Sequence, residues 1–296
     1  MLKNHNTCCV LFYDNTKYDE LANLAYNSFV NFHKNEVDTI FITPYNIQDY
    51  PITTYTNHPE VNGIKKYIRG YDIMITGGYD KVIIMDVDTI TCARLDEFLD
   101  DNTDVLATLN YPCQESTEWW TTPLYTLETE DGQILHDHAN LNAGVICVNN
   151  SNALKKIIDL SIDHLNHFAE QSGLNELAWS DGSYEVKVVD GPYIASDVIY
   201  NCRAKGVFGT NMISLDSPLK AYYIHENKLL NQHEKQIKVF HMVEGLGGRP
   251  DSEFKQMVDD IKFKWFNQET IEFFKNICGT KDFFINEYKF PNARNT

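Results

Sequence analysis

Apolar and polar stretches alternate along the first part of the chain in a way that predicts strands and helices in turn. The apolar run at residues 8–13 ends in the turn-forming tetrad DNTK, which indicates a strand followed by a loop. Residues 18–33 carry apolar side chains at helical spacing, and residues 37–43 form the next apolar run. A strand, a helix and a strand within about 40 residues make a βαβ unit, so these two strands are expected to lie parallel.

The rest of the chain continues the same alternation. The expected elements are a helix at 64–75 that Gly70 weakens, a strand at 81–85, a helical turn at 95–100, a strand at 104–110, a strand at 141–149, a helix at 153–170, a helix at 196–206 with Ser196 as N-cap and Gly206 as stop, a strand at 237–242 and helical structure near the C-terminus. Residues 111–140 lack periodicity and read as an excursion over a site. No Pro/Gly linker divides the chain, so the prediction is one α/β domain.

Composition narrows the class of protein. The formal net charge of -17 argues against binding nucleic acid or anionic membranes, since no dense cluster of Lys and Arg offsets it. Seven scattered cysteines without a Cys-x-x-Cys pair are typical of reduced thiols. The N-terminus lacks a signal-peptide pattern, and no apolar stretch approaches the roughly 18 residues of a membrane span. We therefore expect a soluble, cytoplasmic protein without a transmembrane segment.

Two carboxylates follow the apolar run KVIIM at 81–85. Asp86 and Asp88 are two residues apart, a spacing that puts both side chains on one side of an extended chain. Oxygen ligands suit Mg²⁺, Ca²⁺ or Mn²⁺, and ligands bind at the carboxyl ends of strands in open α/β sheets. The alternative is that Asp86 caps the following turn and Asp88 is solvated. The position directly after a buried strand makes the metal-binding hypothesis about as strong as this alternative.

Later segments offer further candidates. His241 follows the apolar run IKVF, and as a third ligand it would favour Mn²⁺ over Mg²⁺; a structural role is the alternative. The glycines after it let backbone amides approach a ligand, and Arg249 could pair with a phosphate. Gly144, inside the segment LNAGVICVN, marks the close approach of a ligand or of another part of the chain.

Three other features are less specific. Arg69 could be a solvated helix charge, and Asp197 could be an ordinary acid in a capping turn. The histidines of HDHAN at 136–140 suggest zinc, but no cysteine or distant histidine pair has the matching spacing.

These segments, taken in order from about residue 8 to 250, resemble the family 8 glycosyltransferases, which include glycogenin and bacterial lipopolysaccharide galactosyltransferases. DKVIIMDVDTIT is similar to the family's metal-binding Asp-x-Asp strand, and LNAGVICVN to its Asn-Ala/Ser-Gly segment. SDVIYN is similar to the Asp-Gln-Asp helix start but keeps one acid of that motif, Asp197. HMVEGLGGRP is similar to the His-x-x-Gly-x-x-Lys-Pro signature, with Arg249 in place of the lysine and one extra residue after Gly245. Arg69 lies where the family keeps a basic residue for the donor.

The resemblance implies a GT-A type nucleotide-binding domain at residues 1–255, with a mostly parallel central sheet flanked by helices, and a helical extension at 256–296. It implies that the metal ligands are Asp86, Asp88 and His241. It also implies roles for Asp197 and Asn142 in catalysis. The implied donor-binding residues are Phe12, Asp14, Asn15, Tyr18, Arg69, Asp86, Val87, Asp88, Asn142, Ala143, Gly144, His241, Gly245 and Arg249.

The implied activity is a retaining, metal-dependent transfer of a hexose from a nucleotide diphosphate-sugar, expected to be a UDP-sugar, to a hydroxyl group. Mn²⁺ or Mg²⁺ would offset the charge that develops on the leaving diphosphate. The acceptor would be a glycan, a lipid-linked molecule or a protein. Two alternatives stay open: a sugar-nucleotide nucleotidyltransferase, although FYDNTKY lacks the Gly-rich loop expected there, and a carbohydrate-binding protein that lost turnover.

Overall fold

A computed structural model of the chain describes residues 4–53, 55, 62–109, 141–163, 169–189, 194–196, 222–231, 234, 236–241 and 268–279. Its centre is a six-stranded sheet with the strand order β2-β1-β3-β6-β5-β7. The strands are β1 (Thr7–Phe12), β2 (Asp38–Ile42), β3 (Lys81–Met85), β5 (Val105–Leu109), β6 (Leu141–Val148) and β7 (Val186–Val188). β1 runs parallel to β2 and β3, and β7 parallel to β5, whereas β6 runs antiparallel to both its neighbours. The expected mostly parallel α/β sheet is confirmed.

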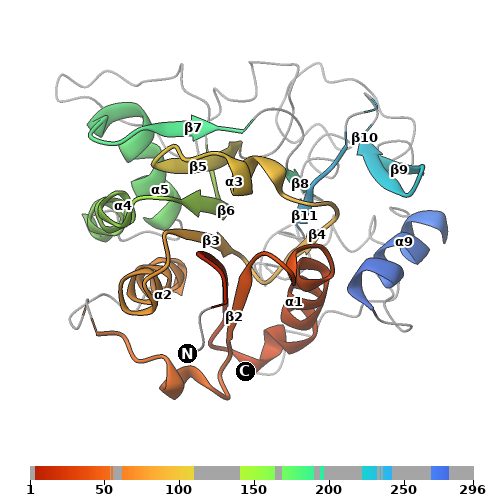
Figure 1. The fold of residues 1–296 in the computed structure, drawn as a ribbon, viewed down its shortest axis with the longest axis horizontal. Coiled ribbons are helices and arrows are strands. Elements are labelled where there is room, and N and C mark those ends of the chain that lie inside the picture. Colours follow the sequence, from red (N-terminus) through yellow and green to blue (C-terminus); the bar gives the residue numbers. More distant parts are fainter. Residues whose placement is uncertain are drawn as a thin grey trace, which may run out of the picture.

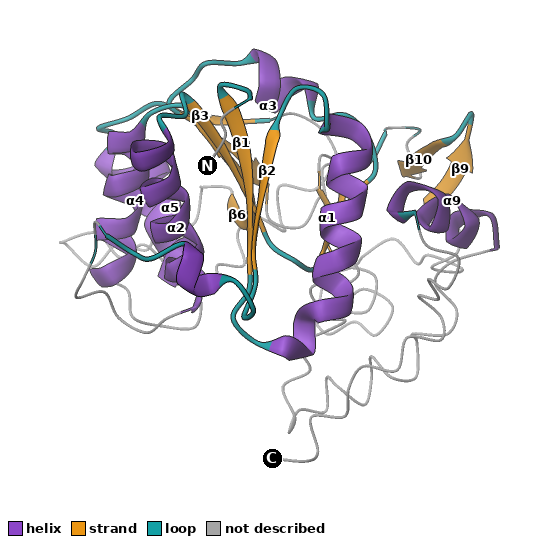
Figure 2. Ribbon diagram, turned by 60° about the horizontal axis from the view of Figure 1, so that its bottom comes forward, coloured by secondary structure: helices purple, strands orange, loops and turns teal. Residues whose placement is uncertain are grey.

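Helices cover both faces of this sheet. α2 (Asn62–Gly77), α4 (Ser151–Asp163) and α5 (Ala169–Glu176) lie on one face, and α1 (Asp19–His33) lies on the other (Figures 1 and 2). Because side chains alternate across a strand, Val82 and Ile84 enter the core under α2, while Ile83 and Met85 enter the core under α1. Burial on both sides explains why the strand reads as a continuous apolar run.

Gly70, which was expected to weaken its helix, lies inside a continuous α2. α2 continues through it to Gly77, and a Cβ on Gly70 would lie 2.6 Å from Cδ1 of Ile84 in the sheet below. The glycine therefore lets the helix approach β3 closely.

Smaller elements complete the described part. β4 (Thr89–Thr91), β11 (Val239–His241) and β8 (Ile194–Ser196) form a three-stranded sheet, and β9 (Tyr222–His225) and β10 (Lys228–Asn231) form a hairpin. α3 (Asp96–Asp100) precedes β5, and a π-helical turn at Leu177–Asp181 follows α5. The 3₁₀ turns are Thr16–Tyr18 and Ile47–Asp49. α9 (Gln268–Cys278) packs against α1 and β9, and its Phe274 ring lies 5.7 Å from that of Phe240.

Two expectations from the sequence need adjustment. The helix expected at 153–170 begins earlier, at Ser151, and by residue 169 a separate helix, α5, has begun. Ser196 is the last residue of strand β8, and the helix expected after it lies outside the described residues, as does the excursion at 111–140. The domain boundary at 255/256 also lies outside them, so that division stays a prediction.

Candidate active site

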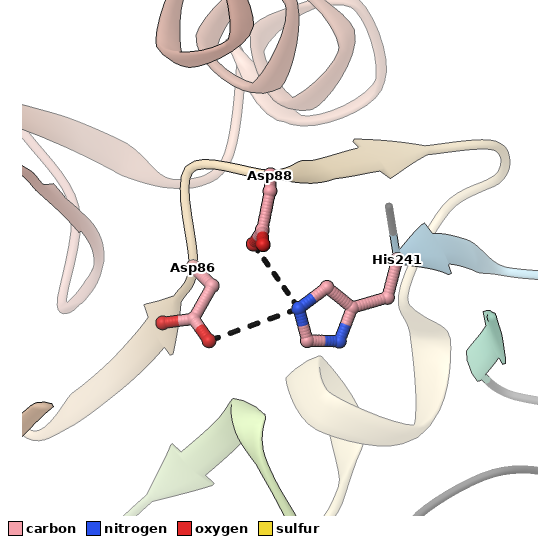
Figure 3. Close-up of side chains that lie close together, drawn as sticks. All are labelled: Asp86, Asp88 and His241. Carbon is pink, nitrogen blue, oxygen red and sulfur yellow. Dashed lines mark hydrogen bonds and ion pairs between the residues drawn. The ribbon is translucent and has the colours of Figure 1, made fainter. Parts of the chain in front are cut away.

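The two acidic side chains lie on the turn that connects β3 to β4. The turn is held by two hydrogen bonds: the Asp86 amide donates to the carbonyl of Gly144 at 2.7 Å, and Thr89 Oγ1 donates to the carbonyl of Asp86 at 2.6 Å. β11 pairs antiparallel with β4, which sets His241 opposite Thr89. Residues more than 150 positions apart therefore meet, and Figure 3 shows Asp86, Asp88 and His241 pointing toward one another.

Their distances fit a divalent cation. Nε2 of His241 lies 3.1 Å from Oδ1 of Asp88 and 3.8 Å from Oδ2 of Asp86. The three ligand atoms all lie within 4.8 Å of one another, and among the described residues they form a group with a metal-compatible donor set. Nδ1 of His241 is buried without a hydrogen-bond partner in the described part of the chain. Two carboxylates and one imidazole suit Mn²⁺, so these residues fit the ion that the sequence predicted.

Gly144 leaves the space in which this group assembles. A Cβ on that residue would lie 2.4 Å from Cε1 of His241, 2.8 Å from Oδ1 of Asn142 and 3.0 Å from Oδ2 of Asp86. A side chain at this position would force the His241 ring to shift, so the glycine lets the group assemble in the arrangement seen here. The sequence predicted a close approach here, and the structure shows that the approaching groups are the candidate ligands.

Electrostatic interactions within the ligand set shift the pKa values of its members. Burial alone would raise the pKa of Asp88, but attraction to His241, their hydrogen bond and the charge of Lys66 lower that pKa below its usual value. Burial would likewise lower the pKa of His241, yet Asp88 and Asp86 together raise it. A bound cation would stabilise the two carboxylates in place of protonated His241, whose Nε2 would have to lose its proton to become a ligand.

Lys66 is a site residue that sequence reasoning missed. Its Nζ donates to Oδ1 of Asp86 in a very short contact and to the carbonyl of Ala143 at 3.0 Å, and the side chain is buried. Lys66 lies three residues before Arg69 on α2, so the helical repeat puts both on one face. That spacing was the available signal.

Arg69 is buried beside the end of β1. Its guanidinium carbon lies 6.0 Å from the centre of the Phe12 ring, and its Nε and Nη1 have no hydrogen-bond partner among the described residues. Burial lowers the pKa of this arginine. Unsatisfied buried donors are costly, and an anionic or hydroxyl-rich ligand would satisfy them.

The loop after β1 contains the other residues expected at the nucleotide. Asp14 accepts a hydrogen bond from Nζ of Lys65 at 3.3 Å, which ties the loop to α2. The carbonyl of Asn15 accepts from the amide of Tyr18 at 3.0 Å, and Tyr18 directly precedes α1. These contacts place the loop at the carboxyl end of β1.

The segment at the start of β6 is held by its own side chains and by α5. Oδ1 of Asn142 accepts from the amide of Gly144 at 2.7 Å. Oε1 of Gln171 accepts from the amide of Ala143 at 3.4 Å, and Tyr67 donates its hydroxyl to the Ala143 carbonyl at 3.2 Å. Val87, by contrast, has its side chain in the core under α1, which leaves only its backbone for a ligand.

Several expected residues cannot be placed. Asp197, Gly245, Arg249 and the histidines at 136–140 lie outside the described residues. The described ligand set is therefore brought together by the fold, whereas the predicted phosphate-binding and acceptor-side residues stay predictions. Among the helices that the structure describes, none has the length and apolar character needed to cross a membrane.

The chain matches no known family model and no curated protein. Among the solved structures that it resembles are several glycosyltransferases. One is the galactosyltransferase LgtC in complex with donor and acceptor sugar analogues: 14% identity, 90% of this chain and 99% of that chain covered, TM-score 0.41. The bifunctional glycosyltransferase WbbM gives 16% identity, 91% and 51% coverage and a TM-score of 0.47. The glycosyltransferase GlyE of Streptococcus pneumoniae gives 13% identity, 92% and 62% coverage and a TM-score of 0.47. The activity is therefore inferred from the side chains of the site.

Proposed function

We propose that the protein is a metal-dependent glycosyltransferase that moves a hexose from a nucleotide diphosphate-sugar, a UDP-sugar, to a hydroxyl acceptor. The observation that carries the proposal is the convergence of Asp86, Asp88 and His241 at the carboxyl end of β3, within 4.8 Å of one another. Carboxyl ends of strands are where open α/β folds bind nucleotides. A cation held there resolves how a chain with a net charge of -17 can bind an anionic donor.

The described residues divide the work of donor binding. Asp86, Asp88 and His241 would hold Mn²⁺ or Mg²⁺, which when bound neutralises charge on the diphosphate leaving group. Arg69 has buried N–H groups that lack a partner among the described residues and that can donate hydrogen bonds to the donor. Asn142 and Ala143 belong to the start of β6, beside the candidate metal ligands. The sugar would lie against them. Phe12, Asp14, Asn15 and Tyr18 would hold the base and ribose.

The remaining features of the proposal rest on the sequence resemblance. Asp197 would bind sugar or acceptor hydroxyls, and Gly245 and Arg249 would bind the phosphates. The transferred sugar would keep its anomeric configuration, which NMR of the isolated product would establish directly. The cytoplasm is the proposed compartment, and the acceptor would be a glycan, a lipid-linked molecule or a protein.

The proposal is tested with a panel of nucleotide diphosphate-sugars and nucleoside triphosphates in the presence of Mn²⁺. Released UDP or GDP is the readout for sugar transfer or donor hydrolysis, and released pyrophosphate is the readout for nucleotidyl transfer. We expect UDP release with at least one sugar donor and its loss on adding a chelator. Pyrophosphate release from a triphosphate alone would identify a nucleotidyltransferase, and no release from any donor would leave a binding protein.

The variant Asp88→Ala separates the metal role from folding. It removes one ligand oxygen, and we expect turnover to fall by at least about 100-fold, as for loss of a metal-site group, while far-UV circular dichroism stays unchanged. Turnover equal to that of the parent protein would exclude Asp88 from the metal site. Glu185→Ala, at an exposed position after the π-helical turn, is the control for removing one carboxylate.

A further inference from the structure

The carboxylate of Asp86 is divided between two partners. Oδ1 accepts the short hydrogen bond from Nζ of Lys66, while Oδ2 faces Nε2 of His241 at 3.8 Å. Only 5% of the Lys66 surface is exposed. One side of a candidate metal ligand is therefore already occupied by a cation that belongs to the protein.

Lys66 also lies near a second carboxylate, that of Glu170, whose charge interacts with the ammonium. Glu170 lies close by at the start of α5, where its Oε2 would be 2.0 Å from a Cβ on Gly63. The ammonium is thus hydrogen-bonded to one carboxylate of the ligand set and interacts electrostatically with a second one outside that set.

A second buried lysine shows what a purely structural role looks like. Lys81 donates to the carbonyls of Phe98, Leu99 and Asp101 at 2.9, 2.7 and 2.7 Å, so its partners are all backbone groups. Lys66 instead donates one of its hydrogen bonds to the side chain of Asp86, which is a candidate metal ligand. Like charges close together in a buried site repel strongly, because solvent screens them little.

We propose that Lys66 is a resident cation of the site that holds Oδ1 of Asp86 and keeps the affinity for free divalent ions low. The ion then binds tightly only together with an anionic donor, whose phosphates supply the negative charge that offsets both cations. This inference rests on the proposed function, since it assumes that the donor is a diphosphate. Lys66 is a positioning residue here, because it hydrogen-bonds to the ligand Asp86 and to the Ala143 carbonyl.

The test is a Mn²⁺ titration of the full chain without nucleotide, read by electron paramagnetic resonance of the free ion. Lys66→Met removes the charge, and we expect the dissociation constant for Mn²⁺ to fall about tenfold. Lys66→Gln also removes the charge but keeps an N–H donor, so it is expected to give the same direction with less disturbance. Lys155→Met is the matched control, because that exposed lysine also pairs with an aspartate, Asp159, and should leave the constant unchanged.

An unchanged or higher dissociation constant in the folded variants overturns the inference, because a lysine that merely supports the structure would weaken the site when lost. Lys66→Gln decides if Lys66→Met does not fold. Absence of Mn²⁺ binding in the parent and in both variants also overturns it. This readout is separate from that of the donor panel. If the parent protein releases no nucleotide but the Lys66 variants still bind Mn²⁺ more tightly, the proposed function is contradicted and this inference is not.

Discussion

The two ends of strand β3 use buried charge in opposite ways. At the start of the strand, Lys81 donates to three backbone carbonyls around the end of α3. At the far end, Asp86 and Asp88 face His241, whose Nδ1 has no partner in the described part of the chain. One end pairs its charge with backbone groups, whereas the other pairs charged side chains with one another in a cluster that could also bind a cation.

The difference separates stability from function. A charge whose partners are all backbone groups holds elements together, and its loss leaves buried carbonyls unsatisfied. A cluster of two carboxylates and one imidazole can instead bind a cation, which would offset the negative charge of Asp86 and Asp88. Ligand sites at the carboxyl ends of strands follow from this asymmetry, because turns there are free to carry polar side chains.

The largest effect on stability is expected at the start of β3. Lys81→Met removes three hydrogen bonds to backbone carbonyls, one buried and two partly buried, and we expect the free energy of unfolding to fall by about 3 kcal/mol. Urea denaturation measures this change, and the Mn²⁺ affinity of the folded protein should not change. Lys187→Met is the control: that lysine pairs with Asp101 near the same place but is 54% exposed, so its loss should cost less than about 1 kcal/mol. Equal effects in both variants would contradict the comparison.

Changes at the far end of β3 should affect metal binding. Gly144→Ala puts a Cβ 2.4 Å from the His241 ring, which must move, and we expect Mn²⁺ affinity to fall about 30-fold, or about 2 kcal/mol. Turnover should fall with it. Calorimetric titration with Mn²⁺ is the measurement.

A second glycine provides the matched control. Gly70→Ala pushes against Cδ1 of Ile84 in the core, at 2.6 Å, so it should lower stability and leave Mn²⁺ affinity near that of the parent protein. If both alanine variants weakened Mn²⁺ binding alike, the effect at Gly144 would reflect general disturbance of the fold.

The smallest effect is expected on the surface beside α3. Arg94 makes a bidentate pair with Glu36 at 2.9 and 2.8 Å, but the two side chains are 44% and 33% exposed. Solvent screens such pairs, so Arg94→Gln should change the free energy of unfolding by less than about 1 kcal/mol. Thermal denaturation checks this value. A loss comparable to that of Lys81→Met would show that exposed and buried charges contribute alike at this end of the strand.

Much of the fold could be predicted because it follows from local patterns. β1, β2, β3, β6 and α1 lie where apolar periodicity placed them, since burial of one or both faces decides which residues are apolar. The short strands β4 and β8 escaped prediction because three residues by themselves carry no readable period, whereas β11, which is equally short, lies within the longer apolar run predicted at 237–242. The antiparallel direction of β6 depends on the path of the chain before it, which no local pattern encodes.

The candidate site divides in the same way. The spacing of Asp86 and Asp88 after a buried strand can be read from one short stretch of the sequence. The glycine in LNAGVICVN can be read from another. The sequence alone therefore indicated cation ligands at the first stretch and a close approach at the second. The pairing of β11 with β4 that brings in His241, and the contact of Lys66 with Asp86, were decided only by the tertiary structure. The physical reason is range: periodicity and turn chemistry act between neighbours along the chain, whereas a contact between side chains far apart in sequence depends on how the sheet and its helices pack.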